Sequence, residues 1–492
     1  MKVLLAGYNV DADIIEDLKE KGSYKKDNVT PETLSASYAR ISRDPRAINE
    51  IRKDAREEVE KTRKSNKIII FNLGHSSVAE HAVFNFDIVG VSRLVMEHLE
   101  KFRLASYTEK SQRYITLEDD FVLPKEIAES EFAEKYRAVI RDQNALYHKL
   151  FERLKAHVFA ENSELAQDSK KHALLEGWAK EDARYITSLG TEAQVGMTVN
   201  ARTLELMLRR FASSPLEEVR ELGRMLYGCV EKIAPSIIRY HEANALDQKT
   251  YSELREYAGV FVDKKKNINS DDVILSDYDK DGDCLIGSAI LYSSSDLTYS
   301  EARECFTKMN EDEKAGLFKC ACSHLQLYNS VVREYEFSGL TYDLVVSAAC
   351  FGQLKRHRMT SIVTQPYNPD LGVTIPAAIR EVGMEKDFLQ IIEKTNDLYR
   401  LMKPVIGEAA DYVLTNAHQR RVLLRTNVRE LYHMSRLRED AHAQWDIRQK
   451  TELMRREAAK VMPFSCLLIG AKDVFADVYQ KVYGCEPEKI SK

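Results

Sequence analysis

Two stretches of this chain decide its fold: KFRLASYTEKSQRY at residues 101–114 and RHRMTSIVTQPYNP at residues 356–369. They are two versions of one motif. The second version keeps an opening basic triplet, Arg356, His357 and Arg358, whereas the first keeps a closing Glu-x-Ser-x-Arg that ends at Arg113. A motif that occurs twice indicates an internal duplication, and here each version retains what the other has lost.

The sequence around the two motifs repeats in the same order. Alternating apolar residues predict a strand before each motif, a helical pattern leads into it, and a long amphipathic helix follows it. The predicted elements are strands at 82–88 and 340–344, helices at 92–103 and 347–358, and long helices that begin at the tripeptides Asn200–Arg202 and Asn427–Arg429. We therefore expect an α/β (α+β) protein made of two tandem copies, each a small sheet with long helices.

The two copies differ in length. The interval from motif to tripeptide is longer in the first copy, which predicts a helical, charged insertion within residues 130–180. The polar segment 263–272 reads as a linker or surface loop between the copies. We expect the first copy at residues 1–250, with a degenerate Arg-His-Arg triplet, and the second at residues 271–492, with an intact one.

Composition excludes some classes of function. A chain of 492 residues with 44% hydrophobic and 30% charged residues is typical of a globular protein with two or more domains. A net charge of −5 argues against a general binder of nucleic acid or anionic membranes, which carries a basic surplus. The N-terminal stretch has only a brief apolar run, so neither a signal peptide nor a membrane span is expected. These features predict a cytoplasmic protein.

The sequence offers no convincing metal site. The eight cysteines are scattered without the spacing of a disulfide framework or a zinc site. Residues 277–283 match the start of a calcium-binding loop, but Ser288 stands where that loop needs a bidentate glutamate. Residues 273–275 and 285–286 read as strands around this stretch, so we interpret it as a hairpin turn.

The basic triplet and the long second-copy helix carry the candidate chemistry. Arg356, His357 and Arg358 concentrate positive charge and forked donors, which suit a phosphate or an anionic ring. A solvated basic helix end is the alternative interpretation of the triplet. Asn427 and Arg438 lie on one helix face, about 16 Å apart along the axis, a separation that a dinucleotide or paired ligands can span.

Longer blocks give a family resemblance. Residues 426–448, with their Leu-Arg and His-Ala-Gln-Trp elements, resemble the C-terminal block of the flavin-dependent thymidylate synthases, and residues 74–93 resemble their N-terminal block. The resemblance implies mixed α/β subunits that form tetramers and hold flavin and nucleotide where subunits meet. It also implies conversion of dUMP to dTMP with FAD, methylenetetrahydrofolate and NADPH. Two copies per chain then predict a homodimer with a pyrimidine nucleotide as substrate.

The resemblance also assigns roles to individual residues. The implied catalytic residues are Arg438 and Arg356. The implied substrate-binding residues are Gln353, Glu109, Ser111, Arg113 and Arg184. The implied cofactor-binding residues are Arg356, His357, Arg358, Asn427, Arg429 and His433.

Neither copy keeps the whole family pattern. The departures are His98, Lys101, Phe102 and Phe211 in the first copy and Thr364, Pro366, Asn368 and Asp411 in the second. Because the losses are complementary, we expect one composite site that combines the intact elements of both copies. Two other hypotheses remain: a catalytically inactive homologue that binds flavin or nucleotide or serves as a scaffold, and a flavin enzyme with a changed substrate.

Overall fold

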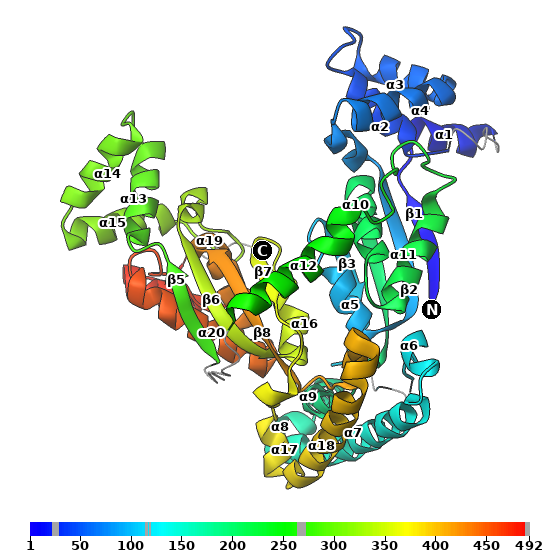
Figure 1. The fold of residues 1–492 in the computed structure, drawn as a ribbon. Coiled ribbons are helices and arrows are strands. Elements are labelled where there is room, and N and C mark those ends of the chain that lie inside the picture. The colour runs from blue at the N-terminus through cyan, green and yellow to red at the C-terminus, as the bar shows by residue number, and fades with distance from the viewer. Residues whose placement is uncertain (22–28, 114–116, 118–119, 263–271, 488–492) are drawn as a thin grey trace. The chain divides into compact units, whose positions relative to one another are not determined.

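The computed structural model describes residues 1–21, 29–113, 117, 120–262 and 272–487 (Figure 1). The chain divides into two compact units. Unit 1 comprises Met1–Lys266 and Pro376–Thr415, and unit 2 comprises Asn267–Ile375 and Asn416–Lys492. A segment from the second half of the sequence therefore folds into the unit of the first half.

Unit 1 contains a four-stranded antiparallel sheet in the order β1-β2-β4-β3. Its strands are β1 (Lys2–Tyr8), β2 (Val83–Ser92), β3 (Ala105–Glu109) and β4 (Glu192–Asn200). The two central strands, β2 and β4, pair from Val83 opposite Asn200 to Ser92 opposite Glu192. A bulge interrupts this register at Gly90, whose φ of 74° lies in the left-handed region that favours glycine.

Helices surround this sheet and extend beyond it. Those of the first half are α1 (Ala12–Lys21), α2 (Glu32–Arg40), α3 (Ile48–Glu57), α4 (Val59–Lys67), α5 (Arg93–Glu100), α6 (Lys125–Ala128), α7 (Ala133–Glu161), α8 (Ser163–Ala166), α9 (His172–Ala183), α10 (Ala201–Ala212), α11 (Glu217–Val230) and α12 (Ala245–Phe261). Shorter helical turns are η2 (Ile68–Asn72), η3 (Ser76–His81), η4 (Ser169–Lys171) and η5 (Arg184–Ile186). The second half adds α17 (Ala377–Glu381), α18 (Glu385–Ile406) and η8 (Gly407–Val413).

The long helices of the two copies pack against each other within unit 1. Helices α7 and α18 lie side by side, as Figure 1 shows in cyan and orange. The buried amide of Gln143 donates to the Thr395 hydroxyl at 2.8 Å and to the Val413 carbonyl at 3.0 Å. Nearby, a Cβ at Gly190 would stand 2.2 Å from the hydroxyl oxygen of Tyr136, so only glycine fits this close approach. The helical segments of both copies therefore share one core.

Unit 2 repeats the sheet in the order β5-β6-β8-β7, again antiparallel. Its strands are β5 (Val273–Tyr278), β6 (Gly339–Ser347), β7 (Ser361–Thr364) and β8 (Gln419–Asn427). Its helices are α13 (Gly282–Ser293), α14 (Tyr299–Lys308), α15 (Glu311–Cys322), η6 (Arg333–Phe337), α16 (Ala348–Leu354), η7 (Pro369–Leu371), α19 (Val428–Arg438), α20 (Trp445–Val461) and α21 (Phe475–Tyr483).

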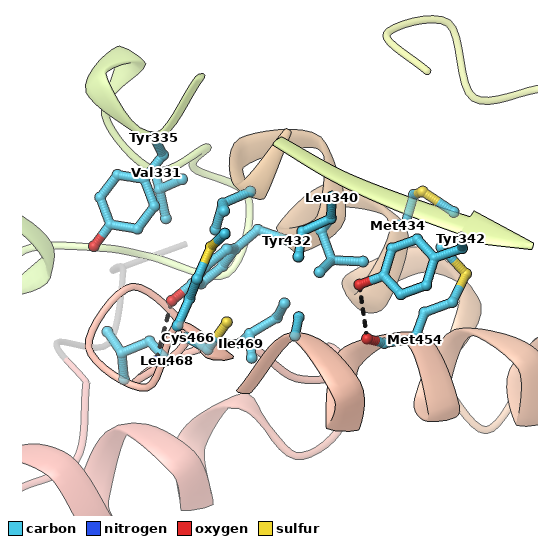
Figure 2. Packing of buried hydrophobic residues seen from close by; sticks show 14 of the residues in the cluster. Val331, Tyr335, Leu340, Tyr342, Tyr432, Met434, Met454, Cys466, Leu468 and Ile469 are labelled. Atoms are coloured by element: carbon cyan, nitrogen blue, oxygen red, sulfur yellow. Dashed lines mark hydrogen bonds between the residues drawn. The ribbon is translucent and has the colours of Figure 1, made fainter. Parts of the chain in front are cut away.

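The core of unit 2 packs one sheet face against α19, α20 and the segment that follows α20 (Figure 2). The hydroxyl groups of two buried tyrosines donate hydrogen bonds inside this core. Tyr342 donates to the Met454 carbonyl at 2.9 Å, and Tyr432 donates to the Ser465 carbonyl at 2.8 Å. Because these bonds join β6 to α20 and α19 to the segment beyond α20, they fix α19 against the rest of the unit.

The predicted order of elements is confirmed in both copies. Each motif follows a strand and a helix, β2 with α5 and β6 with α16, and each Asn-x-Arg tripeptide opens a helix, α10 or α19. The strands extend further than predicted, and α5 and α16 are shorter. The predicted first-copy insertion contains α7, α8 and α9.

One predicted element is wrong. Residues 285–286 belong to helix α13 rather than to a strand, because Ile286, Ala289 and Ile290 bury one helical face. The stretch at 277–283 is therefore a strand-to-helix turn, not a hairpin. Asp283 accepts bonds from the Phe464 and Ser465 amides at 3.1 and 2.8 Å, so its carboxylate ties α13 to the segment after α20.

Other expectations concern single features. The predicted linker at 263–272 lies, apart from Asp272, outside the described residues. All eight cysteines are free thiols. Within the described part of the chain, no helix has the length and apolar character that a bilayer crossing requires.

Candidate functional site

Three polar side chains of unit 2 form a continuous hydrogen-bonded network. His357 lies in the turn between α16 and β7, and it is only 2% exposed. Its Nδ1 lies 3.2 Å from Oε1 of Glu430, and its Nε2 lies 3.0 Å from Nε of Arg438. Helix α19 supplies both partners: Glu430 from its first turn and Arg438 from its last residue.

This geometry fixes the protonation of the imidazole. Arginine has only donors, so His357 Nε2 accepts the Arg438 N–H and Nδ1 carries the proton that it donates to Glu430. Burial lowers the pKa of His357, and the Arg438 cation lowers it further, whereas the hydrogen bond to Glu430 acts in the opposite direction. The network therefore holds a neutral histidine beside a fixed cation.

The other predicted residues of the triplet region surround this network. Arg438 Nη2 approaches the Gln353 carbonyl at 3.4 Å, and Arg356 Nε donates to the Gly352 carbonyl at 3.1 Å. The Gln353 side-chain Nε2 is buried and has no hydrogen-bond partner among the residues that the structure describes. Arg356 and Arg358 are exposed. A buried unused donor beside exposed guanidinium groups is a suitable environment for an anionic ligand.

His433 completes the group from the exposed side of α19. Its ring centroid lies 5.9 Å from that of His357. Ligand atoms of His357, Glu430 and His433 lie within 4.8 Å of one another, a grouping that can be considered for a metal ion. The Arg438 cation on His357 Nε2 disfavours a second cation there.

The Asn-x-Arg tripeptides have structural contacts that are the same in both copies. Asn427 caps α19 by accepting the Glu430 amide at 2.8 Å, and Asn200 caps α10 by accepting the Thr203 amide at 2.9 Å. Arg429 pairs with Glu336 at 2.7 Å. In the first copy, Arg202 pairs with Glu80 at 2.5 Å. The two arginine ion pairs join each helix to the helical turn that precedes the central strand of its sheet. The cofactor-binding role of Asn427 and Arg429 stays a prediction.

A second polar cluster lies in unit 1. Arg184 is buried in η5, and Arg113 forms an ion pair with Glu181 at the end of α9. Burial lowers the pKa of Arg184, Glu181 opposes that shift, and the neighbouring cations Arg113 and Arg93 add to it. Arg113 pairs with Glu181 and Arg93 pairs with Glu97 at 3.4 Å, so the cluster of three arginines and two acids carries one net positive charge.

The remaining two predicted residues of unit 1 lie just before Arg113. Ser111 accepts the Arg113 amide through its hydroxyl at 3.2 Å, which folds the segment into a turn. Glu109 is the last residue of β3 and pairs in register with Val195 of β4. Unit 1 therefore holds Glu109, Ser111, Arg113 and Arg184, and unit 2 holds Gln353, the basic triplet and Arg438.

The substituted positions of the first copy form a different contact. Phe102 and His357 follow their cap serines, Ser92 and Ser347, at the same spacing. Phe211 and Arg438 likewise follow Asn200 and Asn427 at the same spacing. In unit 1 the two phenylalanines meet edge to face at 5.7 Å between ring centroids. An aromatic contact thus occupies the positions that carry the histidine–arginine pair in unit 2.

The second copy has lost its equivalent of Arg184. Asp411 precedes Asn427 at the spacing that separates Arg184 from Asn200, and it pairs with Lys403 at 2.8 Å. Burial lowers the pKa of Lys403, but Asp411 outweighs that effect and the pKa is raised overall. An acid that is itself neutralised by a lysine offers nothing to a phosphate.

The motif pattern does not predict Glu430 or Arg420. Arg420 lies over the rings of Phe351 and Tyr367, at 5.0 and 4.4 Å, and donates to the Gln365 carbonyl at 2.8 Å. It therefore fixes the loop at the end of the second motif. The sequence signal for both residues is weak, because an acid near a helix start and an arginine in a strand are common on protein surfaces.

Comparison with known proteins gives two matches to one family along the chain. The profile of the family described as thymidylate synthase complementing protein matches residues 26–236 and again 274–464. A flavin-dependent thymidylate synthase of Clostridium tetani is 31% identical over 43% of this chain and 82% of that protein. A Chlamydia muridarum protein named UPF0159 protein is 24% identical over 85% of this chain and 82% of that protein.

Two solved structures show local similarity. A UMP/dUMP methylase from Streptomyces cacaoi, bound with 5-Br dUMP, is 17% identical with a TM-score of 0.33, over 48% of this chain and 92% of that one. A thymidylate synthase X from Helicobacter pylori with FAD and dUMP is 19% identical with a TM-score of 0.29, over 49% and 99%.

Proposed function

Because this chain belongs to the thymidylate synthase complementing protein family, in two tandem copies, we propose that it is an FAD-dependent methyltransferase. The proposed reaction converts dUMP, or a related pyrimidine nucleotide, to its 5-methyl product. Methylenetetrahydrofolate supplies the one-carbon unit and NADPH supplies the reducing equivalents. The flavin-dependent thymidylate synthase of Clostridium tetani, which matches over most of its own length, supports this choice of reaction.

One observation carries the proposal: the buried network of Glu430, His357 and Arg438. It holds a guanidinium at a fixed position next to exposed basic side chains and the unused amide donor of Gln353. A preorganised cation of this kind stabilises negative charge that develops on a pyrimidine ring, without a covalent nucleophile. We assign that role to Arg438, assisted by Arg356.

The residues around the network fit a flavin dinucleotide. Arg356 and Arg358 offer forked donors for a pyrophosphate, and the exposed ring of His433 lies beside the buried His357. FAD supplies hydride transfer when bound. The residues Arg356, His357, Arg358, Asn427, Arg429 and His433 are the ones we expect to hold it, with Asn427 and Arg429 acting through the position of α19.

The nucleotide phosphate is assigned to the arginine cluster of unit 1. Arg113 lies close enough to Arg184 to contribute to the lowering of its pKa, and Ser111 shapes the turn before Arg113. We propose that Glu109, Ser111, Arg113 and Arg184 serve the same reaction as Gln353 and Arg438. The complementary losses in the two copies support this, because each copy lacks what the other keeps.

Assembly and location follow from the same proposal. Since one family subunit corresponds to one copy, we propose a homodimer that brings together four copies. The eight free thiols suit a reducing compartment, and we propose the cytoplasm.

Release of the hydrogen at C5 of the pyrimidine tests the function. Flavin-loaded protein with methylenetetrahydrofolate and NADPH should release tritium from 5-tritiated dUMP. Arg438→Ala should slow this release by about 100-fold or more, because it removes the cation from the ring, while FAD binding changes less. Arg425→Ala is the matched control, because Arg425 lies in the same unit and contacts Thr341 and aspartates of β5 and the turn after it.

The alternative functions predict other results. A flavin- or nucleotide-binding protein without catalysis would load with FAD and release no tritium from any uracil or cytosine nucleotide. A scaffold would not bind FAD. Release from a cytosine nucleotide but not from dUMP would show the changed-substrate enzyme.

A further inference from the structure

We propose that Glu430 is a positioning residue that, through His357, holds the Arg438 guanidinium in the orientation that the reaction uses. This inference rests on the proposed function, because it takes Arg438 as the group that acts on the pyrimidine. Glu430 is itself 7% exposed and is linked to Arg438 through the imidazole of His357.

The carboxylate of Glu430 is held in place by the start of α19. Its backbone amide donates to the Asn427 side chain at 2.8 Å, in the first turn of the helix. From there its Oε1 reaches the Nδ1–H of His357 at 3.2 Å. A carboxylate at Nδ1 selects the tautomer whose Nε2 is an acceptor, and only that tautomer can receive the Arg438 N–H.

The same helix presents Arg438 from its other end. Glu430 and Arg438 are separated by about 12 Å along the helix axis, yet both contact one imidazole. Helical side chains tilt toward the N-terminus, so the long arginine side chain runs back along α19 to reach the ring. Through this hydrogen bond, the imidazole limits the rotation of the Arg438 side chain. The bond requires the His357 tautomer whose Nε2 is unprotonated.

The first copy shows that Glu430 is not needed for the helix. The corresponding residue there is Thr203, and Asn200 caps α10 through the Thr203 amide in the same way. In the first copy, threonine replaces the glutamate, and Phe102 and Phe211 replace the histidine and the arginine. All three members of the network are therefore absent together, although the helix cap remains.

Electrostatics favour a positioning role over a metal-binding one. The groups that face His357 from α19 are Glu430, His433 and Arg438. Glu430 places one negative charge in this buried group, opposite in sign to the guanidinium. A divalent cation shared by His357 Nδ1 and Glu430 would have to replace the Nδ1 proton, and the Arg438 cation on Nε2 would repel it.

Two variants of Glu430 separate the effect of its side-chain geometry from the effect of its negative charge. Glu430→Gln keeps a side-chain acceptor at the same length, whereas Glu430→Thr introduces the first-copy residue, which is too short to reach His357. Glu452→Gln is the matched control, because Glu452 is an acid of unit 2 that pairs with Arg456 on α20. FAD titration of every variant confirms that the site still folds and loads.

The first readout is the tautomer of His357, from the ¹⁵N shifts of its ring nitrogens, with His357→Gln used to assign the signal. We expect the Nδ1–H form in the parent and in Glu430→Gln, and loss of that form in Glu430→Thr. An unchanged tautomer in Glu430→Thr overturns the proposal whether or not the protein is an enzyme.

The second readout is tritium release from C5 of dUMP. We expect Glu430→Thr to lower kcat by about 10- to 100-fold with little change in the rate of flavin reduction by NADPH, and Glu430→Gln to recover most of the loss. Equal rates in parent and Glu430→Thr overturn the positioning role. If the parent releases no tritium but Glu430→Thr changes the tautomer, the proposed function fails while the structural role of Glu430 stands.

Discussion

At the scale of single residues, the unusual feature is a histidine that is kept neutral. His357 is buried, and its pKa is lowered by that burial and by Arg438, despite the bond to Glu430. In the unfolded chain its pKa returns to about 6.5. As the pH falls below that value, His357 binds a proton in the unfolded chain but stays neutral in the folded chain, so the free energy of unfolding decreases.

Urea unfolding followed between pH 5 and pH 8 measures this effect. The parent should lose stability as the pH falls from about 6.5 toward the lower folded-state pKa of His357, and His357→Gln should lose less over the same interval. His324→Gln, at an exposed histidine of unit 2, should keep the parent's pH dependence. Identical slopes for the parent and His357→Gln would contradict a depressed His357 pKa.

Sequence alone predicts some members of this network and not others. His357 and Arg438 stand in contiguous motifs, so the pattern that reveals the family also reveals them. Glu430 does not stand out, because an acid in the first turn of a helix is accounted for by the helix dipole. The turn after α16 brings His357 to Glu430, and this contact depends on tertiary packing that no local sequence pattern predicts.

At the scale of elements, the two Asn-capped helices form a natural pair for comparison. Replacing either cap, by Asn200→Ala or Asn427→Ala, should lower the free energy of unfolding by about 1 kcal/mol, because a helix amide loses its acceptor. Urea titration of each variant measures it. Only Asn427→Ala should also slow tritium release, because only α19 carries Glu430 and Arg438. Equal effects of both variants on turnover would show that α19 has no special role.

The predicted order of strands and helices is correct because period-two and period-3.6 patterns are local. Residues 285–286 show where such patterns fail, since a short apolar run fits a strand or a buried helix equally well. Its helical state is decided by packing: a Cβ at Gly282 would lie 2.4 Å from Met462, so the start of α13 lies tightly against the end of α20.

At the scale of the whole molecule, the duplication does not produce two self-contained halves. Residues 376–415 of the second half fold into unit 1, where α18 packs on α7 and Gln143 bonds to Thr395. The contacts join residues far apart in the sequence, so neither composition nor periodicity predicts them. Elements of both copies therefore share the core of unit 1, so the two copies do not correspond to two separate compact units.

The last prediction concerns the number of flavins. In unit 1 the positions of the histidine–arginine pair hold Phe102 and Phe211, and Phe211 is 2% exposed and packed against Gly223, whose added Cβ would lie 3.0 Å from it. An anionic dinucleotide placed there would meet an aromatic contact in place of the histidine–arginine pair. The cation beside that contact is Lys101, whose Nζ lies 5.9 Å from the Phe102 ring centroid and whose pKa is lowered by burial, so binding there is unfavourable. Equilibrium dialysis should therefore saturate at about one FAD per chain, since only the second copy keeps the histidine–arginine pair. His357→Phe combined with Arg438→Phe, which imports the first-copy pair, should abolish that binding, whereas Phe102→Leu should leave it unchanged. Two tight FAD per chain in the parent, or loss of FAD in Phe102→Leu, would show that the first copy still binds flavin.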